Sequence, residues 1–189
     1  MLRKLCIFAV FLLTSGVPAF AQESRELTEE ARKQYAMGLK EASALIKDRQ
    51  YANAEVKLDA LLLQRPREPQ ARFLKGVAET ELGRTDAAIA VFRALIEDYP
   101  ELPEPYNNLA VLHAQRGEYD SARLALETAI RTAPDWAVAH ENLGDIYARL
   151  AAAQYDRAAK LDRGNKTAPV KLTLVRDLLA PGAQARPKS

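Results

Sequence analysis

The fold is decided by residues 103–136, PEPYNNLAVLHAQRGEYDSARLALETAIRTAPDW, because the pattern of this stretch recurs along the chain every 34 residues. Prolines recur at this interval, and so do glycines, small residues and large apolar residues. A fixed period shared by several independent positions indicates a repeat protein. The recurring series are Pro66, Pro100 and Pro134; Gly83 and Gly117; Ala42, Gly76, Ala110 and Gly144; Ala54, Ala88 and Ala122; and Leu58, Phe92 and Leu126. The repeats begin near Tyr35, Pro69, Pro103 and Ala137.

Each repeat reads as a hairpin of two helices. The small residue at the eighth position predicts that a neighbouring helix comes close to the first helix there. Gly83 and Gly117 fall where that first helix should end, and glycine relieves the strain of a left-handed helix end; Arg49 occupies this place in the first repeat. The proline at the thirty-second position stops the second helix, because it can neither donate a hydrogen bond nor fit in a helix interior.

This spacing resembles the tetratricopeptide-repeat family, most closely at Tyr106-x-x-Leu109-Ala110 and at Ala122-x-x-x-Leu126-x-x-Ala129. The resemblance covers residues 35–165, and residues 99–120 and 141–147 look like those of a group of exported bacterial members. It implies an all-α solenoid of helical hairpins, with about three full repeats, a modified fourth repeat and a C-terminal capping helix. A solenoid of this family is expected to bind other proteins rather than to catalyse a reaction.

The fourth repeat departs from the pattern, because five residues that correspond to the turn at 117–121 are missing. Ala151, Ala152 and Ala153 stand there instead and favour a helix. We therefore predict one continuous helix over 138–161 in place of a hairpin. A last helix within 166–180 is expected to cover the exposed end of the array. Its apolar residues at helical spacing are Val170, Leu174, Val175, Leu178 and Leu179.

The two ends of the chain are expected to lie outside the repeats. Residues 22–34 form an N-terminal helical extension, whose helix runs from Thr28, as the capping residue, to about Asp48. Residues 181–189 form a flexible polar tail.

Residues 1–21 have the pattern of a cleaved signal peptide. Arg3 and Lys4 precede the apolar run 5–13, helix breakers follow, and Ala19-Phe20-Ala21 fits a cleavage site after Ala21. The run is shorter than the roughly 20 residues that cross a bilayer. The expected location is the bacterial periplasm. The only cysteine, Cys6, would leave with the leader, so the mature chain could form neither a disulfide nor a thiolate metal site.

Composition and motifs argue against several function classes. The net charge of +2 lacks the basic excess that nucleic-acid binding requires. No phosphate-binding, zinc-protease or nucleophile-elbow motif occurs. His113 and His140 fall at expected core positions and read as structural residues, although a histidine-based metal site is a remote alternative. Four acidic residues before the third repeat read as a solvated loop. We therefore predict no enzyme activity and no cofactor.

The binding surface is expected on the concave face, which the first helix of each hairpin lines. Apolar side chains there suit a peptide groove, and asparagines can donate to and accept from a peptide backbone. The alternative is that the apolar residues only pack the repeats together. The residues predicted to bind a partner are Lys40, Phe73, Leu74, Val77, Asn107, Asn108, Val111, Asn142 and Asp145.

The partner itself is expected to be a protein or peptide of the cell envelope. A variant of the family clamps a C-terminal carboxylate with basic residues, but Val138 and Asn142 occupy the places of those residues here, so that activity is not expected. Residues 149–189 contain nine basic and three acidic residues, which allows a weak contact with anionic lipids as an alternative to a solubilising surface. A self-associating scaffold is the other alternative function.

Overall fold

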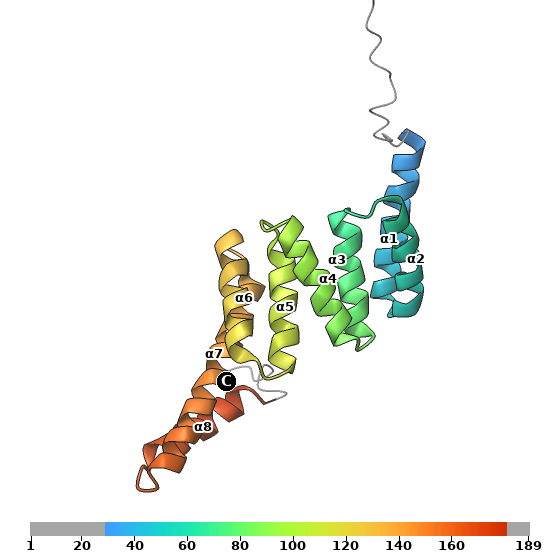
Figure 1. Cartoon of the computed structure of the whole chain (residues 1–189). Helices are drawn as coiled ribbons and strands as arrows, with labels where there is room; N and C mark the ends of the chain where they lie inside the picture. Colours follow the sequence, from blue (N-terminus) through green and yellow to red (C-terminus); the bar gives the residue numbers. More distant parts are fainter. Residues whose placement is uncertain (1–28, 181–189) are drawn as a thin grey trace, which may run out of the picture.

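The computed structural model describes residues 29–180, which form helices joined by short turns and contain no strand (Figure 1). The helices are α1 Glu29–Lys47, α2 Tyr51–Gln64, α3 Pro69–Glu81, α4 Thr85–Asp98, α5 Pro103–Gln115, α6 Tyr119–Thr132, α7 Ala137–Leu161 and α8 Thr167–Leu178. The all-α solenoid predicted from the repeats is confirmed. The expected signal peptide, the capping residue Thr28 and the tail 181–189 lie outside the described residues.

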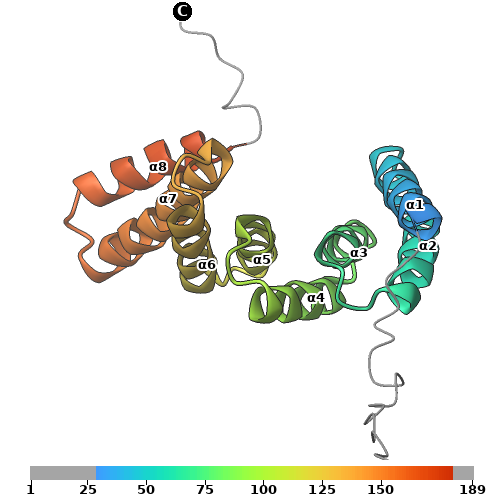
Figure 2. The same ribbon diagram turned by 90° about the horizontal axis from the view of Figure 1, so that it is seen from above.

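The first six helices form three antiparallel hairpins that stack in chain order. Seen from above, they follow a curve with α1, α3 and α5 on its inner side and α2, α4 and α6 on its outer side (Figure 2). The second helix of one hairpin packs against the first helix of the next, as α2 does against α3 and α4 against α5. The first helices therefore face the concave side of the array.

The prolines fix where the second helices end. Pro66, Pro100 and Pro134 each follow the last residue of α2, α4 or α6 by two positions. The residues between, Arg65, Tyr99 and Ala133, have φ angles of −136°, −137° and −136°. A proline disfavours the helical conformation of the residue before it, which accounts for this common geometry.

The turns inside the hairpins need a left-handed residue. Gly83 and Gly117 both have φ of 75°, and Arg49 adopts φ of 59° at the same place in the first hairpin. A residue with a Cβ is strained in this conformation by about 1–2 kcal/mol. The sequence pattern thus marks the turns correctly, and the first hairpin forms its turn in spite of Arg49.

We expect Arg49→Gly to raise the free energy of unfolding by about 1 kcal/mol, because glycine adopts the left-handed conformation without strain. Gly117→Ala should lower it by about as much. No atom lies within 4 Å of a Cβ built on Gly117, so this change tests the backbone alone. Urea denaturation measures both effects. Equal stability of the three proteins would contradict the left-handed turns.

In each full hairpin, the two helices come close together at the small residue in the eighth position. Ala42 and Ala110 are buried, and Gly76 lies against the fully buried ring of Phe92. A Cβ on Gly76 would stand 2.5 Å from that ring, so only glycine fits there without a shift of the neighbouring helix. The small residues at the eighth position therefore let the second helix pack onto the first.

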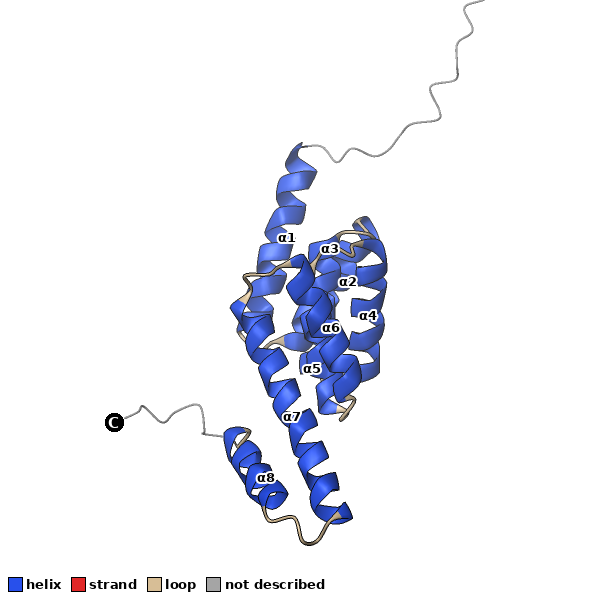
Figure 3. Ribbon diagram, turned by 90° about the vertical axis from the view of Figure 1, so that its left-hand side faces the viewer, coloured by secondary structure: helices blue, strands red, loops and turns tan. Residues whose placement is uncertain are grey.

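The fourth repeat contains one continuous helix, α7, in agreement with the missing turn (Figure 3). Two expectations for this repeat are wrong, because no returning helix covers the first half of α7. Gly144 has no atom within 4 Å of the place of a Cβ, and His140 is exposed instead of lying in the core. Tyr147 is 49% exposed for the same reason.

Helix α8 runs back along the second half of α7, beyond the lower end of the array (Figure 3). The Asn165 side chain accepts hydrogen bonds from the amides of Thr167 and Ala168 and so caps the first turn of α8.

The face of α8 that packs on α7 carries only two of the five apolar residues that the spacing indicated, Val175 and Leu179. Its packing face carries Ala168, Leu172, Val175 and Leu179, whereas Val170, Leu174 and Leu178 are exposed. Apolar residues surround most of this helix, so periodicity alone could not select a face. Within residues 29–180, no helix is long and apolar enough to span a bilayer.

Candidate functional site

Two pockets lie between successive first helices of the array. The smaller, of about 250 Å³, lies between the starts of α3 and α5 and is lined by Phe73, Leu102, Glu104 and Pro105, among others. The larger, of about 410 Å³, lies between the second half of α5 and α7. Its larger volume and its lining by both apolar and charged side chains make this pocket the candidate binding site.

The larger pocket has an apolar floor and a polar rim. Ala110, Val111 and Ala114 of α5, Tyr119 and Leu126 of α6, and Ile146 of α7 form its apolar part. The polar residues that line it are Gln115, Asn142, Asp145 and Arg149. Its size and lining suit one large apolar side chain flanked by polar groups.

The two charged residues of the rim differ in their surroundings. The Arg149 guanidinium lies 5.9 Å from the centre of the Tyr119 ring, at cation–π distance. Asp145 is exposed, and no ion pair within residues 29–180 includes it. The pocket therefore presents a carboxylate that has no cationic partner within hydrogen-bonding distance in this part of the chain.

Three of the predicted site residues meet at this pocket: Val111, Asn142 and Asp145. Asn142 Nδ2 donates to Asn107 Oδ1 at 2.7 Å, and Asn107 is only 9% exposed. Asn107 points toward α7 rather than into open space, so its placement among the exposed groove residues is wrong. Asn108 is half-buried, and its Nδ2 donates to the backbone oxygen of Glu104 at 2.9 Å.

The other predicted residues lie elsewhere on the array. Phe73 lines the smaller pocket and packs against Phe92, with the ring centres 5.8 Å apart. Leu74 and Val77 are half-buried against two of the core clusters, which fits the alternative that they pack repeats together. Lys40 is exposed on α1, away from both pockets.

Seven residues that line the larger pocket are absent from the predicted set: Ala110, Ala114, Gln115, Tyr119, Leu126, Ile146 and Arg149. Gln115 and Arg149 occupy the last concave position of their repeats, so the helical register did place them on this face. Tyr119 belongs to a second helix and Ile146 is buried, and no periodic signal marks either as part of a site.

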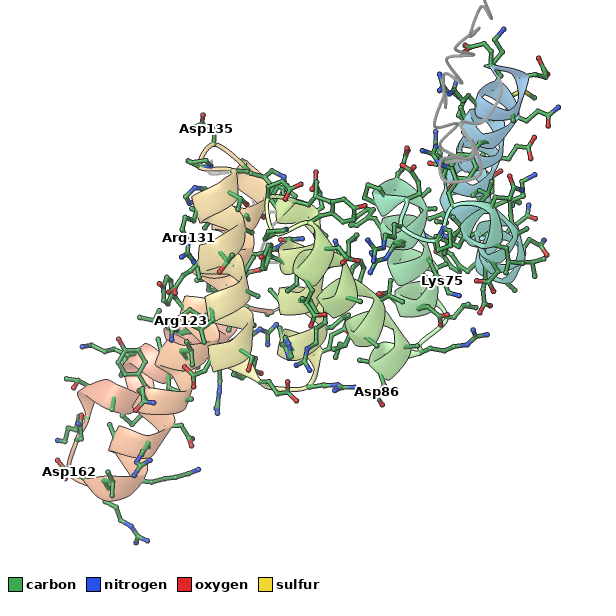
Figure 4. The ribbon with its side chains drawn as sticks, turned by 45° about the horizontal axis from the view of Figure 1, so that its top comes forward. Lys75, Asp86, Arg123, Arg131, Asp135 and Asp162 are labelled. Carbon is green, nitrogen blue, oxygen red and sulfur yellow. The ribbon has the colours of Figure 1, made fainter. Side chains whose placement is uncertain are left out.

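Ion pairs tie neighbouring helices together away from the pocket. Arg84 pairs with Glu55 of α2 at 2.5 Å and with the buried Glu79 of α3 at 3.3 Å. Arg116 pairs with Asp86 of α4, and Lys75 of α3 pairs with Asp59 of α2; Figure 4 labels Lys75 and Asp86. Hydrogen bonding to Glu55 raises the pKa of Arg84, so these guanidinium groups stay charged. These charged side chains already form ion pairs within the fold.

The histidines belong to the structural framework. His113 is buried, and its Nδ1 lies 2.5 Å from Glu118 Oε2 across the turn between α5 and α6. Glu79 and Arg84 make the equivalent contact in the preceding hairpin. His140 Nε2 lies 2.8 Å from the backbone oxygen of Pro134. Within the described residues, no group of three or more histidine, cysteine, aspartate or glutamate side chains could hold a metal ion.

Comparison with known families agrees with this geometry. Two models described as tetratricopeptide repeat match residues 39–103 and 79–150, which together run from the second half of α1 to the first half of α7. The chain belongs to the tetratricopeptide-repeat family. Human tetratricopeptide repeat protein 8 is 34% identical over 85 residues, which are 41% of this chain. The match covers only 16% of that human protein.

Several solved structures share the fold. The first such domain of Spaghetti (RPAP3), bound to an HSP90 peptide, has a TM-score of 0.59 at 14% identity and covers 63% of this chain and 94% of that domain. The Sgt2 domain from Aspergillus fumigatus scores 0.62 at 16% identity, with 70% and 87% covered. The Yersinia enterocolitica secretion chaperone SycD, in complex with a YopD peptide, scores 0.57 at 17% identity, with 70% and 98% covered.

Proposed function

We propose that this chain is a non-catalytic adaptor of the bacterial cell envelope, which binds a segment of a partner protein in its concave groove. The observation that carries this proposal is the pocket of about 410 Å³ between α5 and α7. It combines an apolar floor with polar groups on the concave side of a tetratricopeptide-repeat array, which matches the make-up of peptide-binding grooves.

Two structural neighbours support a protein or peptide as the ligand. The Spaghetti domain is bound to the HSP90 peptide SRMEEVD, and SycD is in complex with a peptide of the translocator YopD. Both identities are below 20%, so the neighbours support the class of ligand and leave its sequence open.

The groove is tested by Val111→Arg, which places a long charged side chain at the pocket. Val111 is 37% exposed, so the variant should fold. We expect at least a tenfold loss of the proteins crosslinked to this chain in intact cells, measured by mass spectrometry. Leu124→Arg is the control, because Leu124 is 56% exposed on α6 and does not line either pocket. Equal recovery with Val111→Arg and with Leu124→Arg would contradict the groove.

The location in the envelope rests on the sequence of residues 1–21. If the leader is removed after Ala21, the exported protein begins at Gln22. Cell fractionation and mass determination of the N-terminal peptide test this directly. Retention of residues 1–21 on protein recovered from the cytosol would contradict the proposed location.

A second candidate function, self-association into a scaffold, is favoured by the outer face of α8. Val170, Leu174 and Leu178 are spaced by four residues and are 59%, 63% and 64% exposed. Light scattering at increasing protein concentration tests it. An oligomer that Leu174→Asp converts to a monomer would support self-association, whereas a monomer at every concentration would contradict it.

A further inference from the structure

Three exposed carboxylates lie on the concave side of the array. Glu104 of α5 and Glu141 and Asp145 of α7 are all exposed. None of the three takes part in an ion pair within residues 29–180, whereas Glu55, Asp59, Glu79 and Asp86 all pair with neighbouring helices. Glu104 and Asp145 therefore line the two pockets without an ion-pair partner in this part of the chain.

Two of these carboxylates have an unfavourable arrangement for the free protein. Glu141 and Asp145 are four residues apart on α7 and so lie on the same face of the helix, one turn apart. Like charges at this spacing destabilise a helix by about 0.2–0.5 kcal/mol. Arg149 follows at the same spacing, and its guanidinium lies over the Tyr119 ring. The spacing of Asp145 and Arg149 favours the helix, but the repulsion between Glu141 and Asp145 does not. A cationic ligand would relieve that repulsion.

Of the three carboxylates, only Asp145 lines the larger pocket. Asp145 lines that pocket together with Val111, Ala114 and Ile146, and Glu104 lines the smaller pocket. An apolar side chain that fills the larger pocket would therefore place the neighbouring residues of its own chain near Asp145 and, one turn earlier on α7, near Glu141. Arg149, the cation of the same pocket, lies over the Tyr119 ring. A cation at those positions is attracted, and an anion is repelled.

We propose that the partner segment is basic and apolar: a large aliphatic or aromatic side chain enters the pocket between α5 and α7, and lysine or arginine residues beside it pair with Glu141 and Asp145. This specificity rests on the proposed groove and names the chemistry that the groove selects. A groove with this specificity would reject an acidic segment.

The test is selection of a displayed library of random 12-residue peptides on the purified protein. We expect the enriched sequences to carry lysine or arginine within three residues of leucine, isoleucine, valine or phenylalanine. An enriched peptide, measured by calorimetry, should bind Glu141→Gln with Asp145→Asn about three- to tenfold more weakly than wild type, because two partly exposed charge pairs are lost. Its affinity for wild type should also fall with added salt.

The control variant removes the same number of negative charges, two, at other positions of the chain. Glu97→Gln with Asp135→Asn neutralises two exposed carboxylates on α4 and in the loop before α7, where Figure 4 shows Asp135 at the end of α6. It should bind the peptide as wild type does.

Enrichment of acidic peptides, or equal affinity for wild type and both variants, would overturn the basic specificity while leaving a binding groove in place. Enrichment of no peptide would contradict the groove itself. Tighter binding after removal of residues 181–189, which include Arg186 and Lys188, would assign the pocket to the chain's own tail and overturn the proposal.

Discussion

Gly76→Ala is expected to lower the free energy of unfolding by about 2–3 kcal/mol, because the added methyl group overlaps the ring of Phe92. The new Cβ would lie 2.5 Å from Cε1 and 2.6 Å from Cζ of that ring, which is fully buried and cannot swing into solvent. Helices α3 and α4 would have to separate to make room. Urea denaturation of the two proteins measures the difference.

Gly144→Ala is the matched control, since Gly144 occupies the same eighth position in the fourth repeat. No atom lies within 4 Å of a Cβ at Gly144. Alanine there should raise the free energy of unfolding by about 0.5–1 kcal/mol, through the helix propensity of α7 alone. If Gly144→Ala destabilised the protein as strongly as Gly76→Ala, a second helix would have to cover α7, and the continuous helix would be wrong.

Phe92→Ala should have the largest effect of any single change considered, about 3–5 kcal/mol of destabilisation. Phe92 is the largest of the fully buried side chains and packs on both Gly76 and Phe73. Its loss leaves a cavity between the two helices of the second hairpin, in the middle of the array. We expect the midpoint of urea unfolding to fall accordingly.

Val56→Ala provides the comparison for a surface position, because Val56 is 72% exposed on α2. Its effect should stay within about 0.5 kcal/mol. A Phe92→Ala protein as stable as the Val56→Ala protein would mean that the second hairpin does not close around Phe92.

The sequence allowed most of the fold to be predicted, because a few residues act through local geometry. Pro66, Pro100 and Pro134 end helices by restricting the residue before them, and Gly83 and Gly117 relieve left-handed turns. The absence of five turn residues predicted the continuous helix α7. Each of these effects operates within a few residues of the chain, so it can be inferred without knowledge of the neighbouring helices.

The positions that could not be predicted depend on which helices are neighbours. His140 and Gly144 share the register of buried positions and become exposed only because no helix returns along α7. Residues of α8 are apolar on most sides, so the choice of Leu172 over Leu174 for the packed face follows from the docking of the two helices. Asn107 was placed on the groove surface by its register, but the approach of α7 buries it.

The candidate site also combines residues that could be predicted from helical register with residues that depend on the neighbouring helices. Helical register brought Val111, Asn142 and Asp145 to one pocket, because they lie on the same face of two parallel helices. Tyr119 and Leu126 complete the pocket from α6, which is the second helix of its hairpin. Their contribution depends on the gap between α5 and α7, and the repeat pattern does not encode that gap.

The central claim is that a partner segment occupies the pocket between α5 and α7. Site-specific photo-crosslinking tests it most directly, with a benzophenone amino acid placed at Val111 or, as the control, at Leu124. The account predicts a light-dependent adduct with a partner protein from position 111 in intact cells, and none from position 124. Adducts from position 124 with none from position 111 would contradict it.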